Sequence, residues 1–325
     1  MKRVFKLSAI AALSLSAYAN ILMPEISRDG KTRNTSVMAV SQSTRTFAYG
    51  DYNSTTFEDD ASNEVDVAIS EIYGGFSNGK FSMELGYNMQ KYESSTSDLD
   101  YVDLSILAGF RANDKLTIGF GLISDELTST TDDTALTIGG TLLVNGTVLG
   151  GTITKHNIDA ITAEGSYLEL TGAFGAAKND LSWETGIVYK TEGEDDVIVG
   201  SRLRVFGNTT YITGLWEFDG SLYYEYGDNQ RDVTTDNDYT EIYASFDAEY
   251  LVNPTFYITP GFEYYSIDRP QTSADYKTMA LNTDFGYRNG KGLDATFGLG
   301  YIVSGEMSGE DIDGLGFNIN VGHVF

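Results

Sequence analysis

Apolar and polar residues alternate along extended stretches of this chain. From Phe81 to Met89 every odd-numbered position is apolar, and every even-numbered position is polar or glycine. A period of two is the pattern of a β-strand with one apolar and one polar face. The same alternation begins again at Val102, Leu116, Leu181, Ile242, Leu293 and Phe317. The chain is therefore predicted to be all-β.

The length of these segments bears on where the strands lie. They run for about 10 residues or more, which is the length that a tilted strand needs to cross the hydrocarbon layer of a membrane. Strands of a soluble β-sandwich, the alternative, are usually nearer 5 or 6 residues, about half that length. The apolar run Leu7–Leu15 is too short to cross as a helix. We therefore expect a transmembrane antiparallel β-barrel.

Short and long connections alternate between the expected strands. Dipeptides typical of tight turns occur at Asn78-Gly79, Asn113-Asp114, Asn179-Asp180, Gly207-Asn208, Asn253-Pro254 and Asn289-Gly290. The longer polar segments between them are Asn53–Asn63, Glu93–Asp98, Thr191–Asp196, Gly227–Asp238, Asp268–Asp275 and Gly305–Asp311. Short periplasmic turns and long extracellular loops are the layout of outer-membrane barrels.

Two segments leave the number of strands open. The connections indicate about 14 strands, with 12 or 16 as alternatives, because single-chain bacterial barrels have an even number. The apolar positions change parity between Ile69 and Ile72, which predicts a β-bulge. Residues 135–154 are apolar around Asn145-Gly146, a hairpin signal, but they lack the aromatic residues of nearly every other strand. We expect them to form a hairpin insert in a long loop, although in the wall they would raise the count to about 16.

The N-terminal residues have the features of an export signal. Lys2, Arg3 and Lys6 precede the apolar run Leu7–Leu15, and Ala17-Tyr18-Ala19 has the small-x-small pattern of a cleavage site. We expect residues 1–19 to be a signal peptide cleaved after Ala19. No linker divides residues 20–325, so we expect them to form a single outer-membrane β-barrel domain.

Composition narrows the class further. The chain has no Cys, which excludes disulfides and thiolate metal sites. Its 22 Tyr, 17 Phe and 35 Gly beside 4 Pro suit many strands with few breaks. A net charge of −26 argues against nucleic acid as a partner. We expect no cofactor and no metal centre.

The C-terminal segment Leu315–Phe325 alternates apolar residues with small or polar ones and ends in Phe. It resembles the last strand of porins and related outer-membrane proteins of Gram-negative bacteria. The resemblance implies a barrel in a bilayer with lipopolysaccharide. From the strand pattern we expect this strand to close the barrel against the segment around Arg45–Tyr52. The resemblance also implies that the outer-membrane assembly machinery reads a signal made of Phe317, Ile319, Val321 and Phe325.

The polar parity of the strands carries many charged residues. If the apolar residues face lipid, the charged ones face the lumen, where they need water around them. The candidate pore-lining residues are Glu84, Asp103, Arg111, Glu169, Glu184, Arg202, Arg204, Glu217, Glu225, Glu241, Asp247, Glu249, Glu263 and Asp284. The further charged residues assigned to this set are Lys115, Lys190, Asp219, Arg288 and Asp294. Because carboxylates predominate, they would favour the passage of cations; Arg202 and Arg204 could also brace the wall by pairing with carboxylates.

We therefore expect a porin-like channel for the passive diffusion of small solutes, with a preference for cations. A transporter of hydrophobic small molecules is the main alternative, in which residues 135–154 form a capture site or constrict the lumen. A surface structural or adhesion barrel without a conducting pore is a third. Tyrosines on the lumen parity could stack on sugars or pack in the wall: Tyr223, Tyr239, Tyr243, Tyr257 and Tyr265.

An enzyme is not expected, because hydrolysis needs a positioned base, commonly His, and the chain has only 2 His. His323 falls on the lipid-facing parity. His156 falls in the expected long loop, with no Ser-rich elbow or metal-ligand spacing around it.

The expected loops are acidic, as in Glu58-Asp59-Asp60. Their carboxylates could bind divalent cations. No loop has the spacing of a defined calcium motif, so a solvated, repulsive surface is the simpler interpretation. Whether the barrel forms a homo-oligomer is left open.

Overall fold

The computed structural model describes residues 25–26, 32–33, 44–59, 64–94, 97–128, 131–160, 163–178, 180–194, 200–228, 238–269, 275–307 and 309–325. The expected signal peptide, residues 1–19, lies outside these ranges. Every regular element in them is a β-strand. Among the described residues there is no helix of the length and hydropathy needed to cross a membrane.

Sixteen strands form one closed antiparallel barrel, in which each strand pairs with its neighbours in sequence. A separate two-stranded sheet pairs β1 (Glu25–Ile26) with β2 (Thr32–Arg33). The barrel strands are β3 (Thr44–Asp59), β4 (Glu64–Asn78), β5 (Phe81–Ser94), β6 (Ser97–Arg111), β7 (Leu116–Thr128), β8 (Thr131–Val144), β9 (Thr147–Ala160), β10 (Ala163–Lys178), β11 (Leu181–Lys190), β12 (Arg202–Thr213), β13 (Trp216–Asp228), β14 (Asp238–Leu251), β15 (Phe256–Asp268), β16 (Tyr276–Arg288), β17 (Leu293–Met307) and β18 (Glu310–Val324). The all-β barrel prediction is confirmed, whereas the preferred count of 14 strands is wrong.

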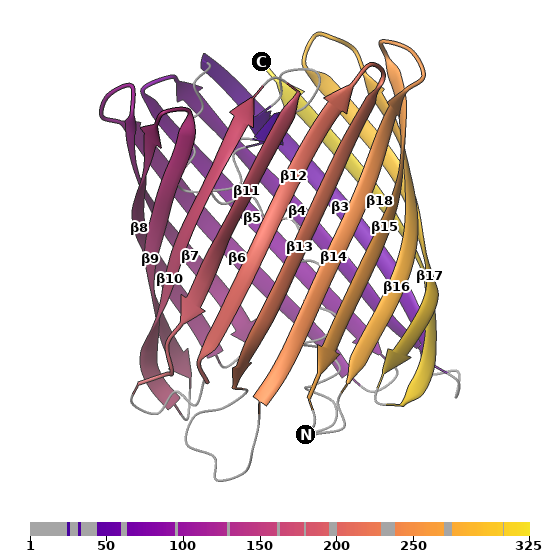
Figure 1. The fold of residues 1–325 in the computed structure, drawn as a ribbon. Helices are drawn as coiled ribbons and strands as arrows, with labels where there is room; N and C mark the ends of the chain where they lie inside the picture. The colour runs from indigo at the N-terminus through magenta and orange to yellow at the C-terminus, as the bar shows by residue number, and fades with distance from the viewer. Residues whose placement is uncertain are drawn as a thin grey trace.

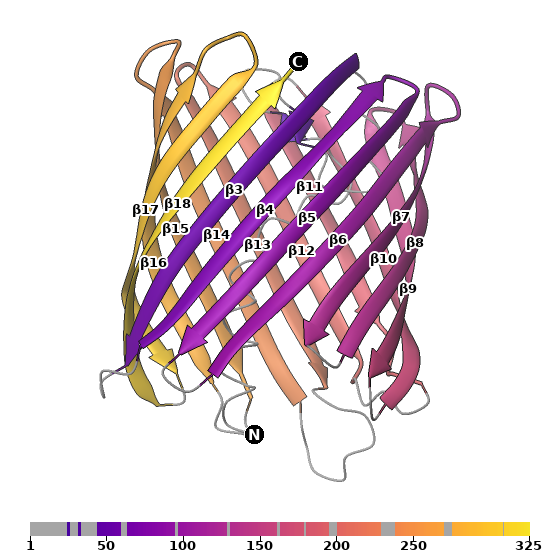
Figure 2. The same cartoon turned by 180° about the vertical axis from the view of Figure 1, so that it is seen from behind.

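The barrel closes between its last and first strands. β18 pairs with β3 from Ile312↔Asp59 to Val324↔Phe47, and the amide of Phe325 donates to the carbonyl of Thr46 at 2.7 Å. The predicted closure of the final strand against Arg45–Tyr52 is confirmed, over a longer stretch than expected. Figures 1 and 2 show the two strands side by side and the strong tilt of the wall.

Residues 135–154 account for the two missing strands. They lie in β8 and β9, which join the wall through pairs with β7 and β10 and are connected by the turn Asn145-Gly146. Asn145 has a φ of 51° and Gly146 a φ of 84°, as a type I′ hairpin turn requires. The expectation of a loop insert is wrong because a strand can join the wall without aromatic residues. The outward positions of residues 135–154 are mainly aliphatic instead.

Two other local predictions are also wrong. Gly207-Asn208 lies inside β12, where Gly207 pairs with Thr185 and Leu222; the turn comes at Gly214, whose φ is 59°. No bulge interrupts β4, whose register with β3 and β5 is continuous. The change of apolar parity there has another cause: Val67 and Ile69 are buried on the inward face, whereas Ile72 is exposed on the outward face.

The two ends of the barrel differ in their connections. At one end, here called the turn end, short turns are held by Asn side chains that accept backbone amides; Asn78 Oδ1, for example, accepts from the amides of Lys80 at 3.0 Å and Phe81 at 2.7 Å. Asn113, Asn253 and Asn289 repeat this arrangement. At the other end, the loop end, the longest connections are residues 191–201, 229–237 and 269–275. Several expected loops are shorter than predicted, since β3 continues through residues 53–59 and β17 and β18 are separated by residues 308–309 alone.

The outer surface of the wall is apolar. On β8, for example, Leu136 is 57% exposed and Ile138 is 60% exposed, while the alternate residues Ala135 and Thr137 are buried. The other strands show the same alternation, with Leu222, Phe285, Phe297 and Ile319 among the exposed side chains. This is the reverse of a soluble protein, and an outward-facing apolar band is typical of a barrel in lipid.

Candidate functional site

The inward face of the wall carries the residues of chemical interest. Because side chains alternate along a strand, the positions between the exposed apolar residues point into the barrel. All fourteen candidate pore-lining residues occupy these inward positions, as do Lys190, Asp219, Arg288 and Asp294. Lys115 does not, because it lies in the exposed turn between β6 and β7.

Two parts of the inward face differ in character. We call the inward positions of β7–β9 the small wall, because they hold mainly Gly, Ala, Thr and small aliphatic residues: Thr117, Gly119, Gly121, Ala135, Thr137, Gly139, Thr141, Val148, Gly150, Thr152 and Thr154. We call the inward positions of β10–β17 the charged wall. It contains most of the candidate pore-lining residues.

A ladder of charges runs across the loop-end half of the charged wall. Arg202 Nη2 lies 2.9 Å from Glu169 Oε2, and its Nη1 lies 3.7 Å from Glu225 Oε1. Arg204 Nε donates to Glu225 at 2.8 Å, and its Nη2 lies 3.9 Å from Glu241. The two guanidinium groups thus link carboxylates from β10, β13 and β14. Such charge-assisted bonds are the stronger kind.

Tyrosines complete this ladder. Tyr239 donates its hydroxyl to Glu225 and Tyr223 donates to Glu241. The guanidinium of Arg204 also lies over the ring of Tyr223, 4.2 Å from its centroid, a cation–π arrangement. Glu225 is only 1% exposed, so its charge depends on these donors rather than on water.

The register explains why such compensation is needed. Three pairs of carboxylates lie directly opposite each other across β13 and β14: Glu217↔Glu249, Asp219↔Asp247 and Glu225↔Glu241. Like charges in this position repel and destabilise a sheet. The arginine ladder offsets this repulsion at the loop-end pair. In the middle pair, Asp219 accepts a hydrogen bond from Thr210 at 2.6 Å.

A second charged network lies at the turn end. Arg288 Nη2 lies 2.7 Å from Glu249 Oε2, and its Nε lies 3.6 Å from Asp294 Oδ2. Tyr257 donates to Asp294 at 2.7 Å, and the guanidinium of Arg288 lies 4.0 Å from the Tyr257 ring centroid. The network has the same parts as the loop-end ladder: guanidinium, carboxylates and a tyrosine ring.

Between the two networks, acids and amides share the wall. The register aligns Asp247 with Gly261 and Asn282, and it aligns Asp284 with Gly298 and Asn318. A Cβ on Gly261 would lie 2.1 Å from Asp247 Oδ1 and 1.9 Å from Asn282 Oδ1, so glycine leaves room for both side chains. Asn318 Nδ2 donates to Asp284 at 3.1 Å. Within the described ranges, no three His, Asp or Glu side chains are arranged to hold a metal ion.

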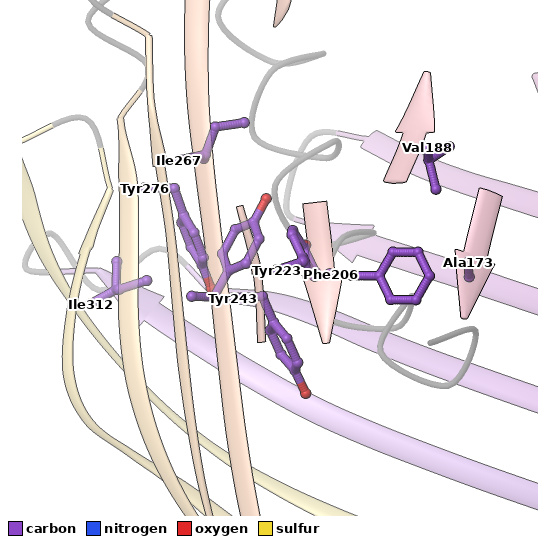
Figure 3. Close-up of a cluster of buried hydrophobic side chains, with 9 residues drawn as sticks. Ala173, Val188, Phe206, Tyr223, Tyr243, Ile267, Tyr276 and Ile312 are labelled. Atoms are coloured by element: carbon purple, nitrogen blue, oxygen red, sulfur yellow. The ribbon is translucent and has the colours of Figure 1, made fainter. Parts of the chain in front are cut away.

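Large side chains line the interior beside these charges. One cluster runs along the inward face from β10 to β18 and includes Phe206, Tyr223, Tyr243, Tyr265 and Tyr276 (Figure 3). Tyr265 and Tyr276 are each only 1% exposed. Their rings pack in the wall, as do those of Tyr223, Tyr243 and Tyr257, and this geometry leaves little ring surface on which a sugar could stack.

The remaining predicted residues have simpler surroundings. Asp103 accepts a hydrogen bond from Asn88 at 3.1 Å, and Arg111 lies 4.0 Å from the exposed Asp114. Glu84 is partly exposed, whereas Glu184 is buried. Phe317, Ile319, Val321 and Phe325 are all exposed on the outer face. Of the acidic loop segment, Glu58 is exposed at the end of β3, and Asp60 lies outside the described residues.

One contact of the interior was not expected. His156 lies in β9 and not in a loop, and its Nδ1 is 2.8 Å from Asp133 Oδ2 on β8. The prediction missed this pair because residues 135–154 were expected outside the wall. The alternation of Ala135, Thr137 and Gly139 with apolar residues is the signal that would have placed Asp133 inside.

No family model and no curated protein matches this chain. Its fold is nevertheless similar to solved outer-membrane proteins. An anion-selective porin from Comamonas acidovorans has a TM-score of 0.53 and 12% identity, with 87% of this chain and 99% of the porin covered. A bacterial polysaccharide outer membrane secretin has a TM-score of 0.54 and 9% identity, with 86% of this chain and 98% of the other covered. At this identity the likeness concerns the fold alone: this chain has the closed barrel fold of porin-like outer-membrane proteins.

Proposed function

We propose that this protein is an outer-membrane channel for the passive diffusion of small hydrophilic solutes. The observation that carries the proposal is the charged inward face of a closed barrel of 16 strands. Barrels of about 16 to 18 strands leave an aqueous passage, whereas smaller ones are filled by side chains. Charged side chains at this density favour a wet interior over an apolar core.

The channel prefers cations in this proposal. Carboxylates outnumber basic side chains on the inward face, and three of the basic ones, Arg202, Arg204 and Arg288, are paired with acids. Fixed negative charge beside a passage bounded by low-dielectric walls attracts cations and repels anions. The similar porin is described as anion-selective, so selectivity cannot be taken over from the fold and has to be measured.

The apolar outer band supports a place in the outer membrane, in contact with lipid and lipopolysaccharide. We propose that the N-terminal signal directs export and that the exposed side chains of Phe317, Ile319, Val321 and Phe325 are read by the assembly machinery. Binding of divalent cations by the acidic loops and assembly into homo-oligomers are further proposals of the same kind.

Transport of hydrophobic molecules loses its main support, because residues 135–154 are wall strands and not an insert. Catalysis is not part of the proposal either: the two histidines contact Asp133 and Tyr167 in one case and Phe325 in the other.

Conductance of the purified, refolded protein in planar lipid bilayers tests the proposal. We expect steady single-channel currents in KCl and a reversal potential of cation-selective sign in a salt gradient. A silent barrel would contradict the channel and favour a structural role, while an anion-selective sign would contradict the cation preference alone.

A pair of variants connects the selectivity to the interior. Glu263→Gln removes an inward carboxylate, and we expect the cation-to-anion permeability ratio to fall by about twofold. Asp311→Asn removes an exposed carboxylate on the outward parity of β18, and the ratio should stay unchanged. If both variants lowered the permeability ratio equally, the selectivity would depend on surface charge and not specifically on the charges in the lumen.

A further inference from the structure

The loop end of the small wall holds a pair of titratable side chains that the proposed channel does not use. His156 Nδ1 lies 2.8 Å from Asp133 Oδ2. A carboxylate only accepts hydrogen bonds, so the proton of this bond belongs to Nδ1. The imidazole stacks on the ring of Tyr167, with centroids 4.3 Å apart and an interplanar angle of 8°. Three neighbouring strands therefore hold the imidazole in one orientation.

The carboxylate of this pair is buried. The Asp133 side chain is only 5% exposed, and that of His156 is 17% exposed. Among the described residues, Asp133 Oδ1 is buried without a hydrogen-bond partner, so the contact with His156 is the hydrogen bond that they give this carboxylate. A buried negative charge is costly unless a positive charge accompanies it. A proton on His156 would supply that charge.

The described charged groups near the pair lie on the side of β10 and β11. On the other side, the backbone register places position 125 of β7 opposite Asp133. On β10, Glu169 is inward and bound to Arg202 at 2.9 Å. On β11, Lys190 Nζ lies 4.7 Å from the centroid of the Tyr167 ring that stacks on His156. Beyond β11, Glu192 and Glu194 are exposed. The positive charge of Lys190 disfavours a proton on His156, whereas the negative charge of Asp133 favours it.

We propose that Asp133 and His156 form a proton-binding site at the loop end of the lumen. The pair carries one net negative charge when the imidazole is neutral and no net charge when the imidazole is protonated. Histidine changes its charge between about pH 5 and 8. The site therefore adjusts the fixed charge at this end of the passage when the imidazole takes up or releases its proton. Its effect on selectivity depends on the proposed channel, but proton binding itself does not.

Selectivity measured against pH distinguishes the two members of the pair. In the unmodified channel we expect the cation-to-anion permeability ratio to fall by about twofold from pH 8 to pH 5.5. His156→Gln keeps the carboxylate and loses the proton site. The permeability ratio should therefore stay high at both pH values, and the step between pH 8 and pH 5.5 should disappear. Asp133→Asn lowers the ratio at every pH but keeps the step. His323→Gln is the matched control, since the other histidine lies on the outward parity of β18 and should leave the step unchanged.

A second measurement keeps the inference testable if the barrel does not conduct. In His323→Gln protein labelled with ¹³C-histidine, the signal of His156 should change with pH as the imidazole takes up a proton. The measurement uses detergent micelles, with the folded state checked by heat-modifiable gel mobility. An imidazole that stays neutral from pH 8 to pH 5.5 overturns the proposal. So does a selectivity step that persists in folded His156→Gln, because the pair would then only brace β8 against β9. Absence of conductance with normal titration would contradict the channel and leave the proton site standing.

Discussion

The small wall and the charged wall belong to one continuous sheet, yet they are stabilised differently. On the small wall, hydroxyls satisfy each other over short distances, as in the buried contact of Thr137 Oγ1 with Thr154 Oγ1 at 2.8 Å. On the charged wall, long side chains reach across two or three strands to pair, as Arg202 and Arg204 do. Backbone pairing is antiparallel in both, so this difference in stabilisation comes from the inward side chains.

This difference has an energetic consequence. Removing one group of a neutral hydroxyl pair leaves a small polar group unsatisfied, whereas removing one group of a buried ionic network leaves an uncompensated charge. The charged wall should therefore tolerate substitution poorly and the small wall well. Three experiments bear on this expectation, each measured as the free energy of unfolding by urea in phospholipid vesicles, followed by the fluorescence of Trp183 and Trp216.

The largest effect is expected for Arg204→Ala. This change leaves Glu225, which is 1% exposed, and Glu241 directly opposite each other without the guanidinium that joins them. We expect a loss of about 3 kcal/mol or more. Arg111→Ala is the matched control, because Arg111 contacts only the exposed Asp114 at 4.0 Å among its described ion pairs, and its loss should be below about 1 kcal/mol. Similar losses in the two variants would show that the ladder adds nothing beyond an ordinary surface pair.

Gly286→Ala should have the next largest effect. A Cβ at this position would lie 1.9 Å from Cζ of Tyr257, whose ring is held by Arg288 and Asp294. The ring has to move, and the turn-end network has to move with it. We therefore expect the free energy of unfolding to fall by about 1 to 3 kcal/mol. Gly172→Ala on β10, where no atom of the described residues lies within 4 Å of the added Cβ, should be close to neutral. A neutral Gly286→Ala would mean that the Tyr257 ring is not fixed by its neighbours.

The smallest effect is expected on the small wall. Thr137→Val alone leaves the hydroxyl of Thr154 buried without its partner and should cost about 1 kcal/mol. The double variant Thr137→Val, Thr154→Val replaces both hydroxyls by methyl groups of the same shape, and it should restore nearly all of the original stability. If the double variant lost more than the single one, the hydroxyls of this wall would have a role besides satisfying each other.

The fold was predictable where local pattern determines it. Strict alternation revealed the strands, and Asn-rich turns revealed most of the reversals. The errors came from positions where a local signal has two meanings. Gly207-Asn208 has the composition of a turn, but Gly207 is an outward residue opposite Thr185 and Leu222. The change of apolar parity after Ile69 has the pattern of a bulge. Its cause is that the apolar residues before it, Val67 and Ile69, pack inside the barrel.

The candidate residues were predictable as a set but not as a network. Parity alone placed Glu225, Arg204 and Glu241 on the same face. Which of them touch depends on the register between strands, and register is set by strand lengths and turn positions across the whole sheet. The pair Asp133 and His156 was missed for the same reason, since its two residues are 23 positions apart and meet only if β8 and β9 are wall strands.

The pairing of β18 with β3 has a consequence for biosynthesis. Asn320 donates to Asp51 across this junction, a contact between residues 269 positions apart. A chain that stops before β18 cannot make it, so such a nascent or truncated chain retains two sheet edges with unpaired backbone groups, which are prone to aggregation. The cell must therefore keep the polypeptide soluble until its final residues have been synthesised. A premature stop codon before β18 should therefore produce a chain that is degraded rather than a smaller pore.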